Sequence, residues 1–152
     1  MQTRRQVLQQ GVAVGGLVAG AGLLPQAAMA FDAKPFEIEG IEDTLKALGV
    51  EGEPEESSDV TLKGPDIAEN GAVVPFTVAT SMDGVKKLAL LIENNPNALS
   101  ALFDVTPAVE ADFSVRSKMQ ETSDVYALAI TDDGKAFYSK KEVKVTLGGC
   151  GG

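Results

Sequence analysis

The residue with the most distinctive chemistry in this chain of 152 residues is its single cysteine, Cys150, which stands third from the C-terminus. It lies between two glycine pairs, Gly148-Gly149 and Gly151-Gly152. A cysteine thiolate is a nucleophile, and a thiol without bulky neighbours can enter a narrow channel. Glycine has the widest backbone freedom of all residues. The pattern therefore predicts a flexible C-terminal arm, residues 148–152, that presents the Cys150 thiol to other proteins.

The composition excludes several kinds of catalytic site. The chain has no histidine, so no Ser-His or Cys-His pair can act as nucleophile and base. No lysine, arginine or helix start stands next to Cys150 to activate it, so we expect partner enzymes to act on it and predict that the protein is not itself an enzyme. Asp132-Asp133-Gly134 predicts a hairpin turn rather than a calcium loop, and Glu55-Glu56 predicts solvated surface. We therefore expect no metal and no cofactor.

The N-terminal segment has the features of an export signal. Arg4-Arg5 precedes an uncharged apolar run of roughly 14 residues, too short to cross the hydrocarbon layer of about 30 Å. Ala28-Met29-Ala30 has the small-x-small pattern of a signal-peptidase site. Residues 1–30 are predicted to be a twin-arginine signal peptide, cut between Ala30 and Phe31, that exports the folded protein to the periplasm and leaves no membrane attachment. An anchor that stays uncleaved is the alternative.

The charge argues against nucleic-acid binding. The formal net charge is −9 at pH 7, and the closest approach to a basic cluster is Lys140-Lys141, which we expect at a solvated strand edge. Nucleic-acid binding needs clustered cations. A single cysteine allows no internal disulfide, and an unpaired cysteine in an exported protein indicates an intermolecular partner or a reactive thiol.

Residues 31–147 are predicted to form one carrier domain. Apolar residues at a spacing of three to four predict a helix over 36–48, although Gly40 lies near its start, and the acidic stretch 51–59 predicts a loop. Alternating apolar residues then predict short strands, over 60–62, 73–80, 85–93, 102–105, 111–118, 125–131, 135–139 and 142–147. Pro75 cannot donate to a ladder, so strand 73–80 is expected at an edge or bulge. With no crossover helices, the fold class is a mainly β, immunoglobulin-like antiparallel β-sandwich with one N-terminal helix.

Three stretches resemble the SoxY family of the thiosulfate-oxidising Sox system. They are the twin-arginine leader, PDIAENGAVVPFTV from Pro65 to Val78, and VKVTLGGCGG from Val143 to Gly152. The resemblance implies a periplasmic carrier that holds sulfur intermediates of thiosulfate oxidation covalently on Cys150 and presents them to successive Sox enzymes. It also implies that the glycines serve as hinges and take no part in the chemistry.

The resemblance further implies a set of protein partners. A SoxZ-like subunit would form a heterodimer with this chain. The Pro75 strand and the Pro65–Gly71 connection are candidate contact regions for it, with ordinary edge-strand or loop structure as the alternative interpretation. A haem-containing SoxAX-like enzyme would conjugate thiosulfate to Cys150, and a SoxB-like hydrolase would release sulfate. Where it exists, a SoxCD-like sulfur dehydrogenase would oxidise the remaining persulfide sulfur.

Three alternatives stay open. A ubiquitin-like carrier would activate the Gly151-Gly152 carboxyl instead, but this needs ATP, and the chain lacks the long central helix of a β-grasp fold. A structural sandwich would dimerise through a Cys150–Cys150 disulfide. A frayed terminus with an incidental cysteine would have no function at all.

Overall fold

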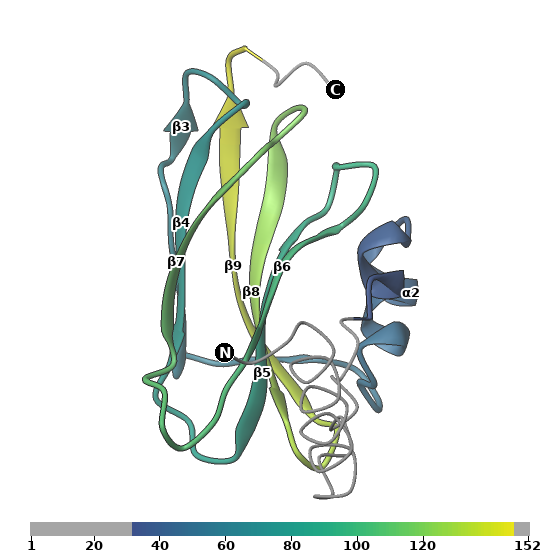
Figure 1. Ribbon diagram of the computed structural model, residues 1–152. Helices are drawn as coiled ribbons and strands as arrows, with labels where there is room; N and C mark the ends of the chain where they lie inside the picture. The colour runs from purple at the N-terminus through teal and green to yellow at the C-terminus, as the bar shows by residue number, and fades with distance from the viewer. Residues whose placement is uncertain (1–31, 148–152) are drawn as a thin grey trace, which may run out of the picture. The chain divides into compact units, whose positions relative to one another are not determined.

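The computed structural model describes residues 32–147, and the fold lies in a compact unit that begins at Ala33 (Figure 1). Two short helical segments come first and strands make up the rest. The elements in chain order are η1 (Lys34–Glu37), α2 (Ile41–Ala47), β1 (Glu55–Glu56), β2 (Val60–Lys63), β3 (Ile67–Ala68), β4 (Val74–Thr80), β5 (Val85–Ile92), β6 (Leu99–Asp104), β7 (Asp112–Ser117), β8 (Ser123–Thr131) and β9 (Ala136–Val145).

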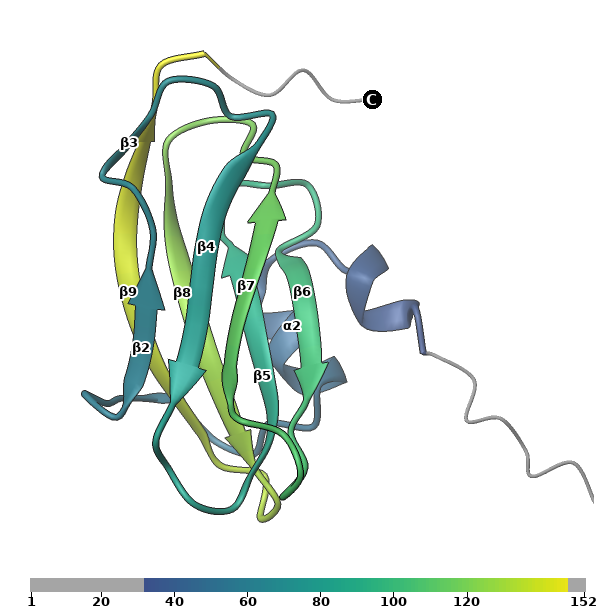
Figure 2. The same cartoon turned by 60° about the vertical axis from the view of Figure 1, so that its left-hand side comes forward.

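The strands form two sheets packed face to face, as Figure 2 shows. The larger sheet has the order β1-β9-β8-β5-β6, with β3 also paired to β9, and the smaller sheet has the order β2-β4-β7. The long strands pair antiparallel, whereas β1 and β3 run parallel to β9 at its two ends. The predicted antiparallel β-sandwich with an N-terminal helical segment is confirmed.

The main core lies between the two sheets and follows the period of two. On β4, Val74, Phe76 and Val78 are buried, and on β5 Leu88 and Leu90 face them from the other sheet. Both alternations were predicted from the sequence. Each such side chain stabilises the fold by about 1.5–3 kcal/mol when it is fully buried.

A second core lies on the other face of the larger sheet, beneath the helical segments. Ala89 and Leu91 of β5 pack there with Leu48, and Leu45 of α2 and Phe36 of η1 cover them. Strand β5, which lies between β8 and β6, is therefore buried on both faces, and this explains its continuous apolar run. The two helical segments thus form a third layer, which covers the outer face of the larger sheet.

The predicted N-terminal helix is present as α2, but its predicted bounds, 36–48, are too long, because η1 is a separate 3-10 segment. Gly40 is the N-cap of α2 and has a φ of 79°. This left-handed conformation favours glycine and interrupts a helix. The Thr44 hydroxyl, which is fully buried, donates to the Gly40 carbonyl at 2.7 Å and fixes the break.

Several predicted strand bounds also need correction. The strands expected at 135–139 and 142–147 are one strand, β9, paired with β8 along its length. Strand β6 begins at Leu99, three residues before the predicted start. The expected loop 51–59 contains β1 and the connection after β2 contains β3, two short strands whose pairing depends on β9 rather than on their own sequences. Glu55 and Glu56 are exposed, as predicted.

Strand β4 is not at an edge, in contrast to the expectation based on Pro75. It is the central strand of the smaller sheet, and Pro75 lies opposite Arg116 of β7. Strand β2 ends at Lys63, opposite Thr77, so no strand pairs with β4 on that side at the level of Pro75. A proline is tolerated there because no ladder partner needs its missing N–H.

Candidate functional site

The last described residues define the point from which the arm continues. Strand β9 ends at Val145, and Thr146 and Leu147 follow it at one end of the sandwich (Figure 1). Cys150 and the arm glycines Gly148, Gly149, Gly151 and Gly152 lie outside the described residues. The same holds for the predicted export and cleavage residues Arg4, Arg5, Ala30 and Phe31.

The end of β9 is bound to the connection between β3 and β4. The Thr146 N–H donates to the Ala68 carbonyl at 3.1 Å, and the Gly71 N–H donates to the Leu147 carbonyl at 2.8 Å. The Thr146 hydroxyl donates to the Glu69 carbonyl at 3.0 Å. The root of the arm is therefore held by hydrogen bonds up to Leu147.

The connection that holds the root is itself ordered by local contacts. The Met119 N–H donates to the Gly71 carbonyl at 2.7 Å, linking this loop to the end of β7. The Asn70 side chain accepts a hydrogen bond from the Ala72 N–H at 2.9 Å, which closes an Asx turn. Asn70 and Gly71 thus help to position the root of the arm. Both lie in the segment from Pro65 to Val78, which is one of the stretches that resemble the family.

Three apolar side chains are exposed around this root. Leu147 is 69% exposed, Val73 59% and Ile67 58%. Leu147 lies within the strand predicted over 142–147, but the strand ends at Val145, so its side chain is not part of the buried face. The sequence pattern did not indicate the exposure of Ile67 and Val73, which flank a turn.

An ion pair and a hydrogen bond from Lys141 hold the segment between β2 and β3. The Lys141 ammonium lies 2.8 Å from a carboxylate oxygen of Asp66 and donates to the Gly64 carbonyl at 2.7 Å. The hydrogen bond from Lys141, together with its charge, lowers the pKa of Asp66 below its usual value. Lys140 is paired with Asp124 at 3.2 Å. The two lysines at this exposed edge are thus neutralised individually, and they form no basic patch.

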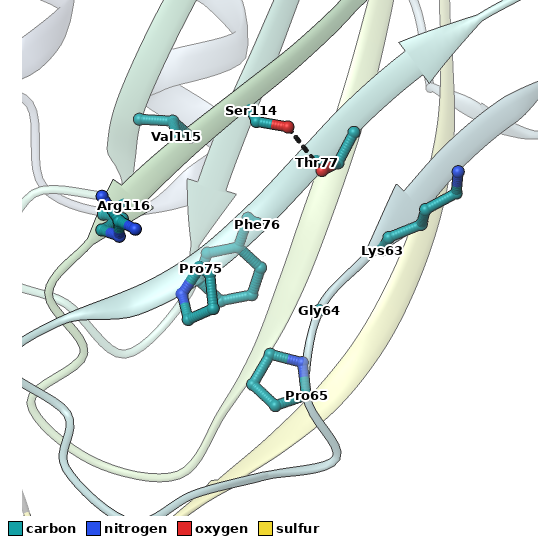
Figure 3. Close-up of a pocket in the computed structure, with 9 residues that line it drawn as sticks. All are labelled: Lys63, Gly64, Pro65, Pro75, Phe76, Thr77, Ser114, Val115 and Arg116. Atoms are coloured by element: carbon teal, nitrogen blue, oxygen red, sulfur yellow. Dashed lines mark hydrogen bonds between the residues drawn. The ribbon is translucent and has the colours of Figure 1, made fainter.

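A groove of about 730 Å³ lies on the outer face of the smaller sheet (Figure 3). Prolines, an aromatic ring, two hydroxyls and two cationic side chains line it: Lys63, Gly64, Pro65, Pro75, Phe76, Thr77, Ser114, Val115 and Arg116. The hydroxyls of Thr77 and Ser114 are hydrogen-bonded at 2.8 Å across β4 and β7. Gly64 allows close approach to the core here, since a Cβ on it would lie 2.7 Å from the Phe76 ring.

The groove carries positive charge in an acidic chain. Lys63 and Arg116 lie on opposite sides of the Thr77–Ser114 pair in Figure 3. Neither forms an ion pair within residues 32–147. The groove lies on two regions named from the sequence as candidate contacts for a second subunit, the Pro75 strand and the start of the Pro65–Gly71 connection.

The described part of the chain shows neither a metal site nor a membrane-spanning helix. Residues 32–147 contain no group of three or more His, Cys, Asp or Glu side chains placed to hold a metal ion. The Asp132-Asp133-Gly134 segment forms the predicted hairpin turn, with Gly134 at a φ of 79°. Among the same residues, no helix is long and apolar enough to cross a membrane.

The fold and this terminus define a class of protein: a β-sandwich whose last strand leads directly into a chain end that carries a single thiol. The chain matches the family described as "Sulfur oxidation protein SoxY" over residues 45–150, and it belongs to that family. The matched segment ends at Cys150.

One solved structure agrees with this assignment, and a second shares the fold. The sulfur carrier protein SoxY from Chlorobium limicola f thiosulfatophilum is 35% identical, with a TM-score of 0.62, over 69% of this chain and 94% of that chain. A superoxide reductase (neelaredoxin) from Ignicoccus hospitalis is 15% identical, with a TM-score of 0.50, over 57% of this chain and 79% of that chain. The second likeness shows the fold alone. No curated protein sequence matches the chain significantly.

Proposed function

We propose that this protein is the covalent sulfur carrier of a periplasmic thiosulfate-oxidation system and that Cys150 holds the intermediates. The observation that carries the proposal is the match to the SoxY family, which extends to Cys150 itself. The held root at Leu147 supports it, because a carrier needs a fixed body from which a short chain end can reach into other proteins.

The chemistry begins with the conjugation of thiosulfate. The Cys150 sulfur forms a bond with the sulfane sulfur of thiosulfate, the thiol proton is released, and an electron pair passes to a haem-containing SoxAX-like enzyme. The product is a cysteine S-thiosulfonate. This step needs an external acceptor for two electrons, because forming the S–S bond is an oxidation and the chain has no second cysteine to form a disulfide that could take them up.

Hydrolysis then releases sulfate. Water attacks the sulfonate sulfur in the active site of a SoxB-like hydrolase, the bond to the sulfane sulfur breaks, and a persulfide remains on Cys150. A SoxCD-like dehydrogenase, where present, oxidises this persulfide sulfur to a sulfonate: three water molecules supply the oxygens, and six electrons pass through the dehydrogenase to its own acceptor. A second hydrolysis then releases this sulfonate as sulfate and restores the thiol. The carrier itself contributes attachment and delivery in every step.

A SoxZ-like subunit completes the proposed carrier. The groove beside Pro75 offers it an apolar floor and two cations, Lys63 and Arg116, that form no ion pair within residues 32–147 and could pair with acidic side chains of the second subunit. Export by the twin-arginine route suits such a pair, because this route transports folded proteins. The predicted signal peptide of residues 1–30 and its cleavage after Ala30 belong to the same proposal.

Sulfate formation in a reconstituted system tests the proposal. The mature protein with its co-purifying subunit is mixed with the conjugating enzyme, the hydrolase and thiosulfate, and sulfate is measured. Cys150→Ser is expected to abolish sulfate formation, whereas Ser139→Ala, a substitution within β9, is the matched control and leaves it unchanged. Normal sulfate formation by Cys150→Ser would favour a structural sandwich, and sulfur found on the Gly152 carboxyl would favour the ubiquitin-like alternative.

A further inference from the structure

A pocket of about 370 Å³ lies beside α2, on the outer face of the larger sheet. Its floor is apolar: Leu91 of β5 and Leu128 of β8 belong to the second core, and Leu45 of α2 packs against them. Pockets of this size, mainly apolar but with a few polar groups, are typical of ligand sites. We call it the tyrosine pocket, after the two rings that line it, those of Tyr126 and Tyr138.

The two rings favour a cationic ligand. The ring centroids of Tyr126 and Tyr138 lie 5.8 Å apart, and the rings are tilted by 58°. The face of a tyrosine ring attracts cations, and the Lys140 ammonium lies 5.9 Å from the Tyr126 centroid. Lys140 is paired with Asp124 and does not line the pocket, so it leaves the charges of the pocket itself uncompensated.

Two carboxylates, those of Glu53 and Glu93, give the pocket negative charge. Both residues are exposed, and neither forms an ion pair within residues 32–147. Glu93 accepts a hydrogen bond of 3.2 Å from the Tyr126 hydroxyl. Burial, followed by the charge of Glu93, raises the pKa of Tyr126, so this phenol stays protonated at neutral pH and continues to donate. Glu93 is thereby held beside the ring, where one cation can contact both groups.

We propose that the tyrosine pocket binds the guanidinium group of an arginine side chain inserted by a partner protein. Arginine fits the lining, because its aliphatic stem suits the apolar floor, while its planar cation stacks on aromatic rings and donates to carboxylates. Exposed contacts of this kind hold a free cation only at roughly millimolar concentrations. The guanidinium is therefore expected to belong to a larger contact between proteins.

This site is separate from the groove beside Pro75. The pocket lies on the α2 side of the larger sheet, and the groove lies on the outer face of the smaller sheet (Figure 1). Both sites can therefore be occupied at the same time. The inference does not depend on the proposed function, because no part of it involves Cys150.

The chemistry of the pocket is tested by NMR of the tyrosine rings. Tyr126 and Tyr138 are the two tyrosines of the chain, so labelling with carbon-13 tyrosine reports on the pocket alone. The mature protein is titrated with N-acetylargininamide, and N-acetylcitrullinamide, which has the same shape without the charge, is the matched ligand. We expect the arginine probe to shift both ring signals with a millimolar Kd, and the citrulline probe to bind at least about tenfold more weakly.

Variants of the carboxylates show whether the pocket itself is responsible. Glu93→Gln keeps an acceptor for the Tyr126 hydroxyl and removes the charge, and Glu53→Gln removes the other charge. Each is expected to raise the Kd of the arginine probe about threefold, and the double variant about tenfold. Glu110→Gln is the matched control, because Glu110 is exposed in the loop between β6 and β7 and lies outside the pocket. Its Kd is expected to be unchanged.

The source of the guanidinium is tested in cells with a photoreactive phenylalanine analogue placed at Ile41, which also lines the pocket. We expect a cross-linked protein that is lost in Glu53→Gln/Glu93→Gln and retained in Glu110→Gln. The absence of any adduct with this dependence overturns the proposal. So does equal binding of the two probes, or an equal effect of Glu110→Gln and the pocket variants. A micromolar Kd for the free probe also overturns it, because the pocket then needs no partner protein to be filled.

Discussion

The Gly71 N–H donates a hydrogen bond of 2.8 Å to the Leu147 carbonyl, and the Gly71 carbonyl in turn accepts one of 2.7 Å from the Met119 N–H. Gly71 therefore links the chain ends of β7 and β9, which belong to different sheets. Leu147 is the last residue before the glycine pair that precedes Cys150. The position from which the thiol extends is thus determined by both layers of the sandwich.

The Thr146 hydroxyl gives a direct test of this anchorage. Thr146→Val keeps the branched shape but removes the hydrogen bond to the Glu69 carbonyl. We expect the free energy of unfolding to fall by about 0.5–1 kcal/mol, and the Gly71 amide, which donates to Leu147, to exchange its hydrogen faster. Thr61→Val in β2 is the control, because Thr61 lies far from the arm root along its sheet. Equal exchange at Gly71 in the two variants would show that the hydroxyl does not hold the root.

The contact between Gly64 and Phe76 predicts a steric coupling. A Cβ at position 64 would lie 2.7 and 2.8 Å from two atoms of the Phe76 ring, and that ring is buried in the core. Gly64→Ala is expected to lower the free energy of unfolding by about 1–3 kcal/mol, because the ring has to shift. Urea denaturation measures it.

The double variant Gly64→Ala/Phe76→Leu provides the control for this prediction. Leu is smaller than Phe and leaves room for the added methyl group. The cost of Gly64→Ala should therefore be smaller in the Phe76→Leu background, a non-additivity expected of residues in contact. Strictly additive free energies would contradict the steric account.

The ion pair of Lys141 with Asp66 predicts a pH dependence. The pKa of Asp66 is lowered in the folded protein from its usual 3.8, chiefly by the hydrogen bond from Lys141. The ion pair therefore stabilises the folded protein at pH values above the unfolded-state pKa of about 3.8. This stabilisation is lost as the pH falls through the lower pKa that Asp66 has in the folded protein. Lys141→Met should return the pKa of Asp66 toward its usual value in a carboxyl-carbon NMR titration. Lys140→Met, which removes the partner of Asp124, should leave it low.

The glycines beside Cys150 predict a separation of folding from transfer. Gly149→Val replaces the least restricted backbone with a β-branched one. We expect the free energy of unfolding to change by less than about 0.5 kcal/mol and sulfate formation to slow with every partner enzyme. Alkylation of Cys150 by iodoacetamide at an unchanged rate is the control for the thiol itself. Unchanged turnover with all partners would count against a hinge function of these glycines.

The parts of the fold that follow local alternation were predictable from the sequence. Val74, Phe76 and Val78 alternate with polar or exposed neighbours, and this pattern places a strand correctly and identifies its buried face. The Asp132-Asp133-Gly134 turn follows in the same way, because its glycine needs a positive φ. Such signals arise from contacts that are near in sequence.

The parts that depend on distant partners were not predictable in this way. Strands β1 and β3 are two residues long and exist because β9 offers each of them a free edge. Pro75 suggested an edge strand, but the early end of β2 lets β4 be central. Leu147 continues the alternation of Val143 and Val145 but lies beyond the strand, so its side chain is exposed.

The state of Cys150 in working cells tests the central claim most directly. The protein is isolated from cells growing on thiosulfate, and its intact mass and the mass of its C-terminal peptide are measured without reducing agent. We predict added sulfur or thiosulfate-derived groups on Cys150, removable by a thiol reductant and absent from cells grown without a sulfur substrate. A Cys150 that carries no sulfur under any of these conditions would contradict the carrier function.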